Sequence, residues 1–180
     1  KVVLASNSPR RKELLAGLGI DYEVKTLPDI DESFPGGLSE VETATYIARA
    51  KADVYRNIMQ SDELIITADT IVWLDGEVMG KPVDEEDARR MLRALSGKTH
   101  QVITGVCLMT IDSQKSFATV TDVTFCHLSE EEIGYYVERY RPMDKAGSYG
   151  IQEWIGFVGV ESISGSYFNV MGLPIQRLYT

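Results

Sequence analysis

The stretch "VVLASNSPRRKELLAGLG" (residues 2–19) decides the fold class, because it changes from an apolar strand to a helix within a few residues. We expect a strand over 2–5 and a helix over 9–18. Ser8 is a preferred helix cap, the following proline suits the first turn, and Gly19 is typical of a helix end. A strand that turns through a tight corner into a helix is the basic unit of α/β proteins.

The rest of the chain continues this alternation. Apolar periodicity and turn residues predict further strands over 22–26, 64–73, 77–79, 100–111 and 116–127, and helices over 40–60, 84–95 and 130–140. The last two of these strands follow each other directly, which predicts an antiparallel pair. The sequence therefore predicts an α/β protein with a mixed sheet, and residues 1–180 as a single domain.

Charge and composition exclude several classes of protein. The 27 acidic and 18 basic residues give a net charge of −9, which disfavours a broad nucleic-acid surface. The apolar runs are too short to span a bilayer, and we expect no signal peptide and no membrane partner. Two cysteines without a C-x-x-C spacing predict reduced thiols and a cytoplasmic location.

Asp69 stands in the apolar run "LIITADTIVWL" (64–74), where an acidic side chain is unusual. Aspartate is depleted in strands, and an unpaired carboxylate is costly in a strand buried on both faces. Asp69 is therefore either a structural residue satisfied by backbone donors or a functional carboxylate. A functional carboxylate here would be a general base or a metal ligand.

Lys51 falls on the apolar stripe predicted for the long helix, which Ala44, Ile47, Val54 and Ile58 define. One interpretation is a lysine whose stem covers apolar surface while its ammonium reaches water. The other is a functional cation, because polar residues that break a local pattern tend to mark function.

Arg10, Arg11 and Lys12 occupy the first turn of the first helix, where the helix dipole disfavours cations. They form either a solvated basic end, tolerated at a cost of about 0.5 kcal/mol, or a phosphate site. Backbone N–H groups and guanidinium groups together suit such a site. The negative net charge makes a local group of cations more informative.

Two loops contain further candidate site residues. Lys81 lies in the constrained loop "MGKP" (79–82), just beyond the predicted hairpin. The acidic loop "DIDES" (29–33) is most simply a solvated loop. Asp31 or Glu32 in that loop is also a candidate partner of Asp69 in a divalent-cation site.

Other catalytic patterns do not fit. The string Gly97-Lys98-Thr99 follows a helix and lacks the earlier glycine of a P-loop. We find no G-x-S-x-G, no G-x-G-x-x-G after the first strand, and no zinc-ligand spacing. The residues alone favour a phosphoester or phosphoanhydride hydrolase, or a nucleotide-binding module, without selecting a base.

Several separate motifs, in order along nearly the whole chain, also resemble a known family. They are "LASNSPRRKELLAGLG", "TADTIV", "GKP", "SGKTHQVITGV", "KAGSYGIQ" and "GSYFNVMGLP". Together they resemble the Maf family of nucleoside triphosphate pyrophosphatases. The resemblance implies an α/β fold with an elongated mixed sheet, flanking helices and two lobes around a central cleft, similar to the inosine triphosphatase group. It also implies hydrolysis of the α–β phosphoanhydride with Mg²⁺ or Mn²⁺, giving a nucleoside monophosphate and pyrophosphate.

The resemblance assigns roles residue by residue. Asp69 matches the catalytic base of the family, and Glu32 matches a carboxylate near the metal, which Asp69 is also expected to bind. The phosphate-handling or substrate-contacting positions of the family correspond to Ser6, Arg10, Arg11, Lys51 and Lys81.

The resemblance is to the dTTP/UTP branch of the family, whose specificity positions correspond to Arg11, Thr70 and Gln152. A carboxamide both donates and accepts, so Gln152 suits the O4 and N3–H edge shared by uracil and thymine. The alternative is a loop glutamine bonded to nearby backbone. Glu153 and Trp154 follow where small residues are expected, a change that leaves room for modified pyrimidines or CTP.

Three functions therefore remain for comparison. The first is a pyrophosphatase for dTTP and UTP, and the second is a 7-methyl-GTP pyrophosphatase with the same chemistry. The third is a nucleotide-binding regulator of septum formation without significant turnover. A homodimer is left open as the oligomeric state.

Overall fold

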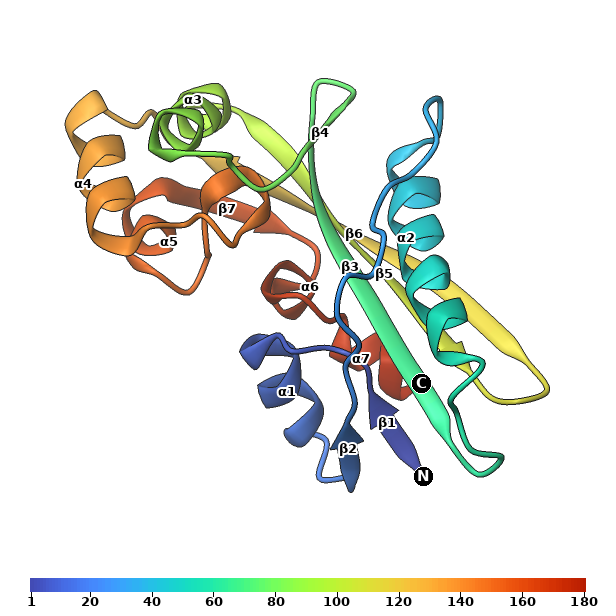
Figure 1. The fold of residues 1–180 in the computed structure, drawn as a ribbon. Helices are drawn as coiled ribbons and strands as arrows, with labels where there is room; N and C mark the ends of the chain where they lie inside the picture. Colours follow the sequence, from blue (N-terminus) through green and yellow to red (C-terminus); the bar gives the residue numbers. More distant parts are fainter. The chain divides into compact units, whose positions relative to one another are not determined.

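The structure is a computed structural model that describes residues 1–180, and its elements are those of an α/β protein (Figure 1). The strands are β1 (Val2–Leu4), β2 (Tyr22–Val24), β3 (Leu64–Leu74), β4 (Glu77–Met79), β5 (Thr99–Met109), β6 (Gln114–Phe125) and β7 (Val160–Ser164). The helices are α1 (Pro9–Ala16), α2 (Glu40–Tyr55), α3 (Glu85–Leu95), α4 (Glu130–Tyr140), α5 (Trp154–Gly159), α6 (Tyr167–Met171) and α7 (Ile175–Tyr179), with a 3₁₀ turn η1 (Ala146–Ser148).

The strands form one seven-stranded sheet in the order β2-β1-β3-β5-β6-β7, with β4 paired to β3. β1 runs parallel to β2 and to β3, whereas β4 is antiparallel to β3 and β7 is antiparallel to β6. A turn closed by a hydrogen bond from Thr110 N to Ser113 O (2.9 Å) joins β5 to β6. The predicted mixed α/β sheet with flanking helices is confirmed, and the predicted cleft stays a prediction.

The chain divides into two compact units. Unit 1 comprises residues 1–70, 103–119 and 172–180, and unit 2 comprises residues 71–102 and 120–171. The assignment of residues 1–180 to one domain stays a prediction, and the two units are described one after the other.

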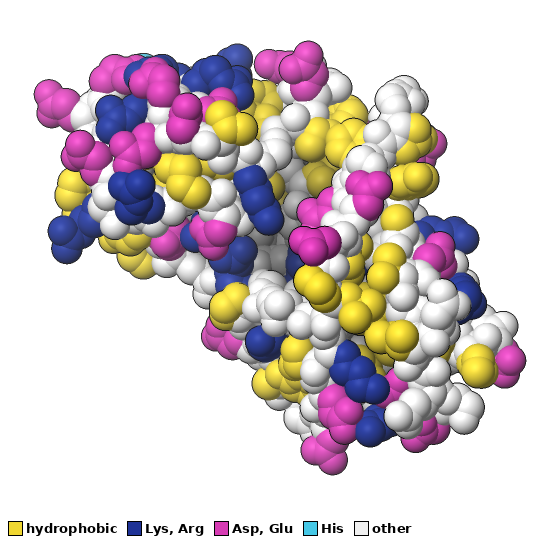
Figure 2. All heavy atoms as spheres, viewed as in Figure 1, with side chains coloured by type: hydrophobic (Ala, Val, Ile, Leu, Met, Phe, Trp, Pro, Cys, Tyr) yellow, Lys and Arg dark blue, Asp and Glu magenta, His cyan; other side chains and the backbone are white.

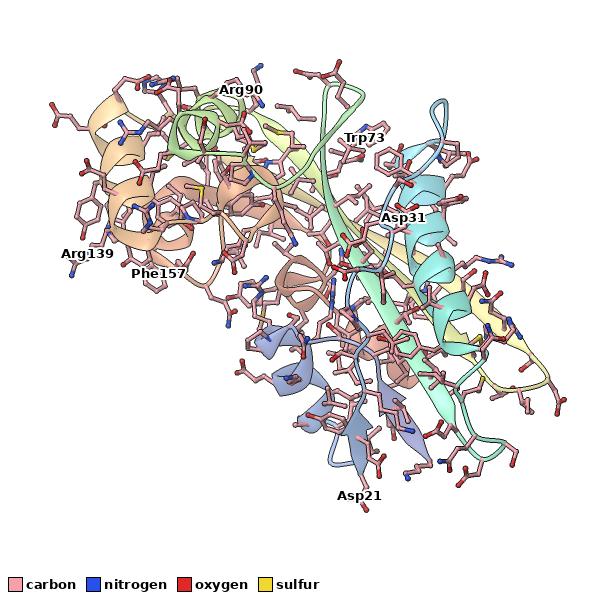
Figure 3. The ribbon with its side chains drawn as sticks, in the orientation of Figure 1. Asp21, Asp31, Trp73, Arg90, Arg139 and Phe157 are labelled. Atoms are coloured by element: carbon pink, nitrogen blue, oxygen red, sulfur yellow. The ribbon has the colours of Figure 1, made fainter.

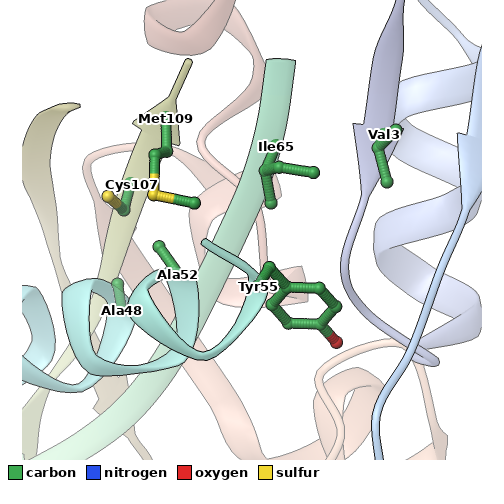
Figure 4. Packing of buried hydrophobic residues seen from close by; sticks show 7 residues of the cluster. All are labelled: Val3, Ala48, Ala52, Tyr55, Ile65, Cys107 and Met109. Atoms are coloured by element: carbon green, nitrogen blue, oxygen red, sulfur yellow. The ribbon is translucent and has the colours of Figure 1, made fainter. Parts of the chain in front are cut away.

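The core of unit 1 is a cluster of buried side chains from β1, α2, β3 and β5 (Figure 4). Its members are Val3, Ala48, Ala52, Tyr55, Ile65, Cys107 and Met109. The alanines let α2 approach the sheet, and the Tyr55 hydroxyl accepts a hydrogen bond from Leu27 N (3.1 Å). This packing fixes α2 against the strand that carries Asp69.

Gly105 brings α2 still closer to the sheet. A Cβ atom at Gly105 of β5 would lie 2.2 Å from the carbonyl oxygen of Ala44, far inside contact distance. Because the obstacle is backbone, no rotation of a side chain could relieve it. The missing side chain of Gly105 therefore sets the position of the first half of α2.

The buried face of α2 differs from the predicted stripe. Ala44 and Ile47 are buried as predicted, but the helix ends at Tyr55 and its Val54 is 42% exposed. Ile58, predicted to lie on the stripe, is 53% exposed and lies beyond the helix. The predicted stripe was wrong in its second half, because Ala48, Ala52 and Tyr55 are the buried residues there.

Unit 2 is built around an aromatic group of His100, Phe125 and Tyr149, whose rings meet edge to face. His100 Nε2 lies 2.6 Å from the Tyr149 hydroxyl, and its Nδ1 is buried without a hydrogen-bond partner. Burial lowers the pKa of His100 to about 4, so the imidazole is neutral near pH 7. The neighbouring helices α3 and α4 bury Ala88, Met91, Leu92, Leu95, Ile133, Tyr136 and Val137.

The surface over α3 and α4 carries interspersed charges of both signs (Figure 2). Arg93 Nε lies 2.8 Å from Glu130 Oε1, and Arg90 Nη2 lies 2.8 Å from Asp87 Oδ1. These exposed pairs contribute little to stability. None of the helices has both the length and the apolar character needed to cross a membrane.

Candidate active site

Asp69 lies in the buried middle of β3, and Lys51 of α2 neutralises it. The Lys51 ammonium donates to Asp69 Oδ1 (2.9 Å) and to the Ala68 carbonyl oxygen (3.2 Å). Both charged side chains are 13% exposed. A carboxylate this buried requires a partner, and the partner here is a side chain that broke the apolar pattern of its own helix.

A second carboxylate reaches the same ammonium. Glu32, in the loop between β2 and α2, places its Oε1 3.3 Å from Lys51 Nζ while its side chain stays 51% exposed. Lys51 therefore lies between two acids, one nearly buried and one open to solvent. Asp69 Oδ2 accepts no hydrogen bond within the chain, so this oxygen remains available for a ligand.

The sequence left open whether Asp31 or Glu32 accompanies Asp69 in a cation site, and of these two acids Glu32 is the one that contacts Lys51. Asp31 lies in the same loop beside α2 (Figure 3), but its Oδ1 accepts a hydrogen bond from Ser33 N (2.9 Å). Hydrogen bonds from Ser33 lower the pKa of Asp31. Asp31 thus stabilises the turn of its own loop, whereas Glu32 contacts Lys51.

Arg11 connects three segments that are far apart in the sequence. Its Nε donates to the Gly172 carbonyl oxygen (2.7 Å), Nη2 donates to Thr70 Oγ1 (3.0 Å), and Nη1 donates to Ser6 Oγ (3.4 Å). Thr70 Oγ1 in turn lies 2.8 Å from Thr104 Oγ1. Because Thr70 follows Asp69 directly, this network fixes the backbone that carries the buried carboxylate.

The environment of Arg11 shows how the basic turn of α1 is accommodated. Burial lowers the pKa of Arg11, and the nearby charge of Asp69 works in the opposite direction. Arg10 is half-buried beside it. Ser8 Oγ caps the helix by accepting from Arg11 N (3.4 Å), and no acidic residue occupies the first turn. Asp69 and the Gly172 carbonyl, rather than acids of α1, therefore compensate the Arg11 charge.

Two predicted site residues belong to unit 2. Lys81 is exposed and makes no ion pair within the chain, and its loop is held by a hydrogen bond from Gly147 N to Gly80 O (3.1 Å). Gln152 is also exposed, and its carboxamide makes no hydrogen bond within the chain. The alternative of a glutamine bonded to nearby backbone is therefore wrong for this structure.

The sequence-predicted residues of unit 1 thus form one connected group. Lys51 joins Asp69 and Glu32, and Arg11 joins Ser6 and Thr70. Two members of the Arg11 network were not predicted, namely Thr104 and Gly172. Thr104 could have been recognised in the same way as Asp69, because it is a polar residue in an apolar stretch of the sequence. The structure buries it fully.

The donor set fits a hard divalent cation only in part. Asp69 and Glu32 offer carboxylate oxygens, and no group of three or more His, Cys, Asp or Glu side chains is placed to hold a metal. Mg²⁺ is commonly held by one or two carboxylates together with substrate phosphates and water. The site therefore fits a cation that arrives with phosphate oxygens rather than one held by protein ligands alone.

The chain matches a family model and is similar in sequence to named proteins. The model described as "Maf-like protein" matches residues 1–180. A protein of Phocaeicola vulgatus named dTTP/UTP pyrophosphatase is 72% identical over 180 residues, which cover 100% of this chain and 93% of the relative. A protein of Bacteroides fragilis with the same name is 69% identical over 179 residues, which cover 99% of this chain and 93% of the relative.

A comparison with solved structures finds more distant neighbours. The Ham1 protein of Staphylococcus aureus has a TM-score of 0.46 at 20% sequence identity, over 69% of this chain and 71% of that chain. A HAM1 protein of Coxiella burnetii has a TM-score of 0.45 at 19% identity, over 69% of this chain and 72% of that chain.

Proposed function

The chain belongs to the Maf family, and we propose that it is a pyrophosphatase that hydrolyses dTTP and UTP to the nucleoside monophosphate and pyrophosphate. Relatives up to 72% identical over the whole chain carry that name. The single structural observation that carries the proposal is the buried Asp69, paired with Lys51 and open at its second oxygen. That arrangement suits the activation of water beside an anionic substrate.

In the proposed reaction, Asp69 orients a water molecule for attack on the α-phosphorus. The water oxygen forms a bond to phosphorus, and the bond to the α–β bridging oxygen breaks with its electron pair leaving on pyrophosphate. The proton of the water passes to the Asp69 carboxylate, and no covalent intermediate is required. Lys51 holds Oδ1 at 2.9 Å, so it fixes which Asp69 oxygen faces the water.

We propose that cations offset the charge that builds up on the leaving group, namely Lys51 and the half-buried Arg10 of unit 1. The family resemblance also implies a phosphate-handling role for Lys81, which is exposed and makes no ion pair within the chain. Preorganised positive groups stabilise a developing anion more than the ground state. The hydrogen bond from Arg11 to Ser6 helps to hold the backbone of the site in place.

We propose that Gln152 selects the base. Its free carboxamide provides one donor and one acceptor for the O4 and N3–H edge that uracil and thymine share. Thr70 and Arg11, the other two specificity positions implied by the family resemblance, are already bonded to each other at 3.0 Å. Their contribution to selectivity therefore depends on the shape of the network rather than on free hydrogen-bonding groups.

We propose Mg²⁺ or Mn²⁺ as the cofactor, with Asp69 and Glu32 as its protein ligands. Bound there, the ion would polarise phosphate oxygens and lower the pKa of a coordinated water. Lys51 contacts both acids, so its ammonium would balance part of their charge at the same place.

The test is a panel of nucleoside triphosphates read as initial rates of pyrophosphate release, with Mg²⁺ and Mn²⁺ compared. The proposal expects dTTP and UTP to give the highest kcat/KM. Preference for 7-methyl-GTP would assign the chain to the other branch. Tight nucleotide binding without pyrophosphate release would favour a nucleotide-binding regulator instead.

We propose a cytoplasmic location for the chain. Cys107 and Cys126 are both free thiols, which agrees with the reducing environment of a cytoplasm. A homodimer is a proposal that sedimentation or scattering in solution would test directly.

A further inference from the structure

Gln152 lies at the tip of a tight turn that runs from Gly150 to Glu153. The turn is closed by a hydrogen bond from Glu153 N to Gly150 O (3.0 Å), with Ile151 and Gln152 as its two central residues. Ile151 is buried, whereas Gln152 is exposed. The position of the Gln152 carboxamide therefore depends on what holds the two ends of this turn.

One hydroxyl group holds both ends. The Tyr136 hydroxyl, on α4, donates to Glu153 Oε1 (2.6 Å) and accepts from Gly150 N (3.0 Å). Burial and the Glu153 carboxylate raise the pKa of Tyr136, so its hydroxyl stays protonated and able to donate near pH 7. The Lys145 ammonium lies 3.7 Å from the same Glu153 oxygen.

The packing around the turn leaves it little freedom. A Cβ atom at Gly150 would lie 2.9 Å from both Glu153 Oε1 and Lys145 Cε, and one at Gly156 would lie 1.8 Å from the Ile151 carbonyl oxygen. The first residue of α5 is anchored as well, because the Trp154 ring packs edge to face on Tyr135 at 4.7 Å between centroids. Both residues that follow Gln152 are thus turned toward α4.

We propose that Tyr136 and Glu153 are positioning residues that fix the Gln152 turn on α4 and thereby set the selectivity for the base. This inference rests on the proposed function, in which Gln152 reads the pyrimidine edge. Glu153 occupies a position where the family resemblance implies a small residue. Its side chain contacts Tyr136, so it supports the turn instead of entering a base pocket.

The test compares Tyr136→Phe with Tyr140→Phe, a matched control that removes a hydroxyl from the same helix, where Tyr140 stacks on Tyr136. Glu153→Ala and Glu153→Gln form a second pair, because glutamine keeps an oxygen that can accept from Tyr136. For each variant, kcat and KM are measured for dTTP, dCTP and dGTP. Hydrogen exchange is measured at the amides of Gly150 and Glu153.

We expect Y136F and E153A to lower the ratio of kcat/KM for dTTP over dCTP and dGTP by about threefold to tenfold, the effect of one hydrogen bond. The loss should appear in KM for dTTP with kcat largely kept, and exchange at both amides should become faster. Y140F and E153Q should retain the ratio of the unmodified chain.

An unchanged ratio in both Y136F and E153A would overturn the inference, even if both variants melt at lower temperature, since that is the pattern of a purely structural contact. Failure of the proposed function gives a different result, namely no pyrophosphate release by the unmodified chain from any triphosphate. In that case the dissociation constants for dTTP and dCTP, measured by calorimetry on the same variants, decide between positioning and structure.

Discussion

The ammonium of Lys51 on α2 lies 2.9 Å from Oδ1 of Asp69 on β3. A buried carboxylate is expensive, and removing one partner of such a pair leaves the other charge uncompensated. Glu32 approaches the same ammonium from solvent at 3.3 Å. The buried pair and its exposed neighbour are the arrangement on which the proposed chemistry depends.

Arg11→Lys should impair both stability and activity. A lysine is a point charge and cannot reach Gly172, Thr70 and Ser6 with the fork of a guanidinium. We expect unfolding in urea to show a loss of about 1–3 kcal/mol, and kcat/KM for dTTP to fall about tenfold. Arg90→Lys is the matched control, because Arg90 pairs only with Asp87 on the surface. Equal effects of the two substitutions would contradict the role given to Arg11.

The sequence predicted the elements better than it predicted the contacts between them. The cap predicted at Ser8 is found, and Ser39 and Ser129 cap α2 and α4 in the same way, because a cap depends only on residues up to three positions away. At Ser129 the Glu132 side chain completes a capping box. Local hydrogen bonding therefore explains why most helix starts could be predicted.

Contacts over long sequence distances could not be predicted in the same way. Arg11 and Gly172 are separated by 161 positions, and nothing near Arg11 indicates that its partner is a carbonyl group. Lys51 and Asp69 were each recognised as misplaced, but their pairing depends on how α2 lies against the sheet. That placement is set by Gly105 and the small residues of α2. A helical pattern of larger apolar residues does not reveal either of them.

Gly105→Ala tests whether the position of α2 matters for the site. The new methyl group would meet the Ala44 backbone at 2.2 Å, so α2 must move or the strand must distort. We expect destabilisation of about 1–3 kcal/mol or more, with a parallel loss of activity because Lys51 moves with the helix. Gly36→Ala is the control, since nothing lies within 4 Å of its added atom. A G105A protein with normal stability and activity would show that α2 tolerates the shift.

Glu32→Gln should weaken the proposed metal requirement of the site without unfolding the chain. Glu32 is half-exposed, so its loss costs little stability. We expect the Mg²⁺ concentration for half-maximal activity to rise about tenfold, and chelation by EDTA to abolish turnover reversibly. Asp31→Asn should leave the metal requirement unchanged, because Asp31 binds its own loop. Full activity in EDTA would contradict a role for a metal.

The buried His100 should make stability depend on pH. Its pKa is lowered to about 4 by burial, whereas the unfolded chain binds the proton at about 6.5. The unfolded state therefore binds more protons between these values. The contribution of His100 to the free energy of unfolding is therefore fully present above pH 6.5. It falls by about 3 kcal/mol as the pH drops to 4.

Urea unfolding of His100→Gln and His127→Gln between pH 4 and pH 7 measures this effect. The exposed His127 serves as the control. H100Q should show a shallower dependence of the free energy of unfolding on pH than the unmodified chain, whereas H127Q should match it. The same slope in all three proteins would show that His100 is not the group responsible.

The central claim is that Asp69 activates the attacking water, and the initial rate of pyrophosphate release from dTTP by Asp69→Asn tests it most directly. Circular dichroism and thermal melting first establish that D69N keeps the fold. The account predicts a rate at least about 100-fold below that of the unmodified chain, with dTTP binding retained. A folded D69N protein that releases pyrophosphate at the unmodified rate would contradict it.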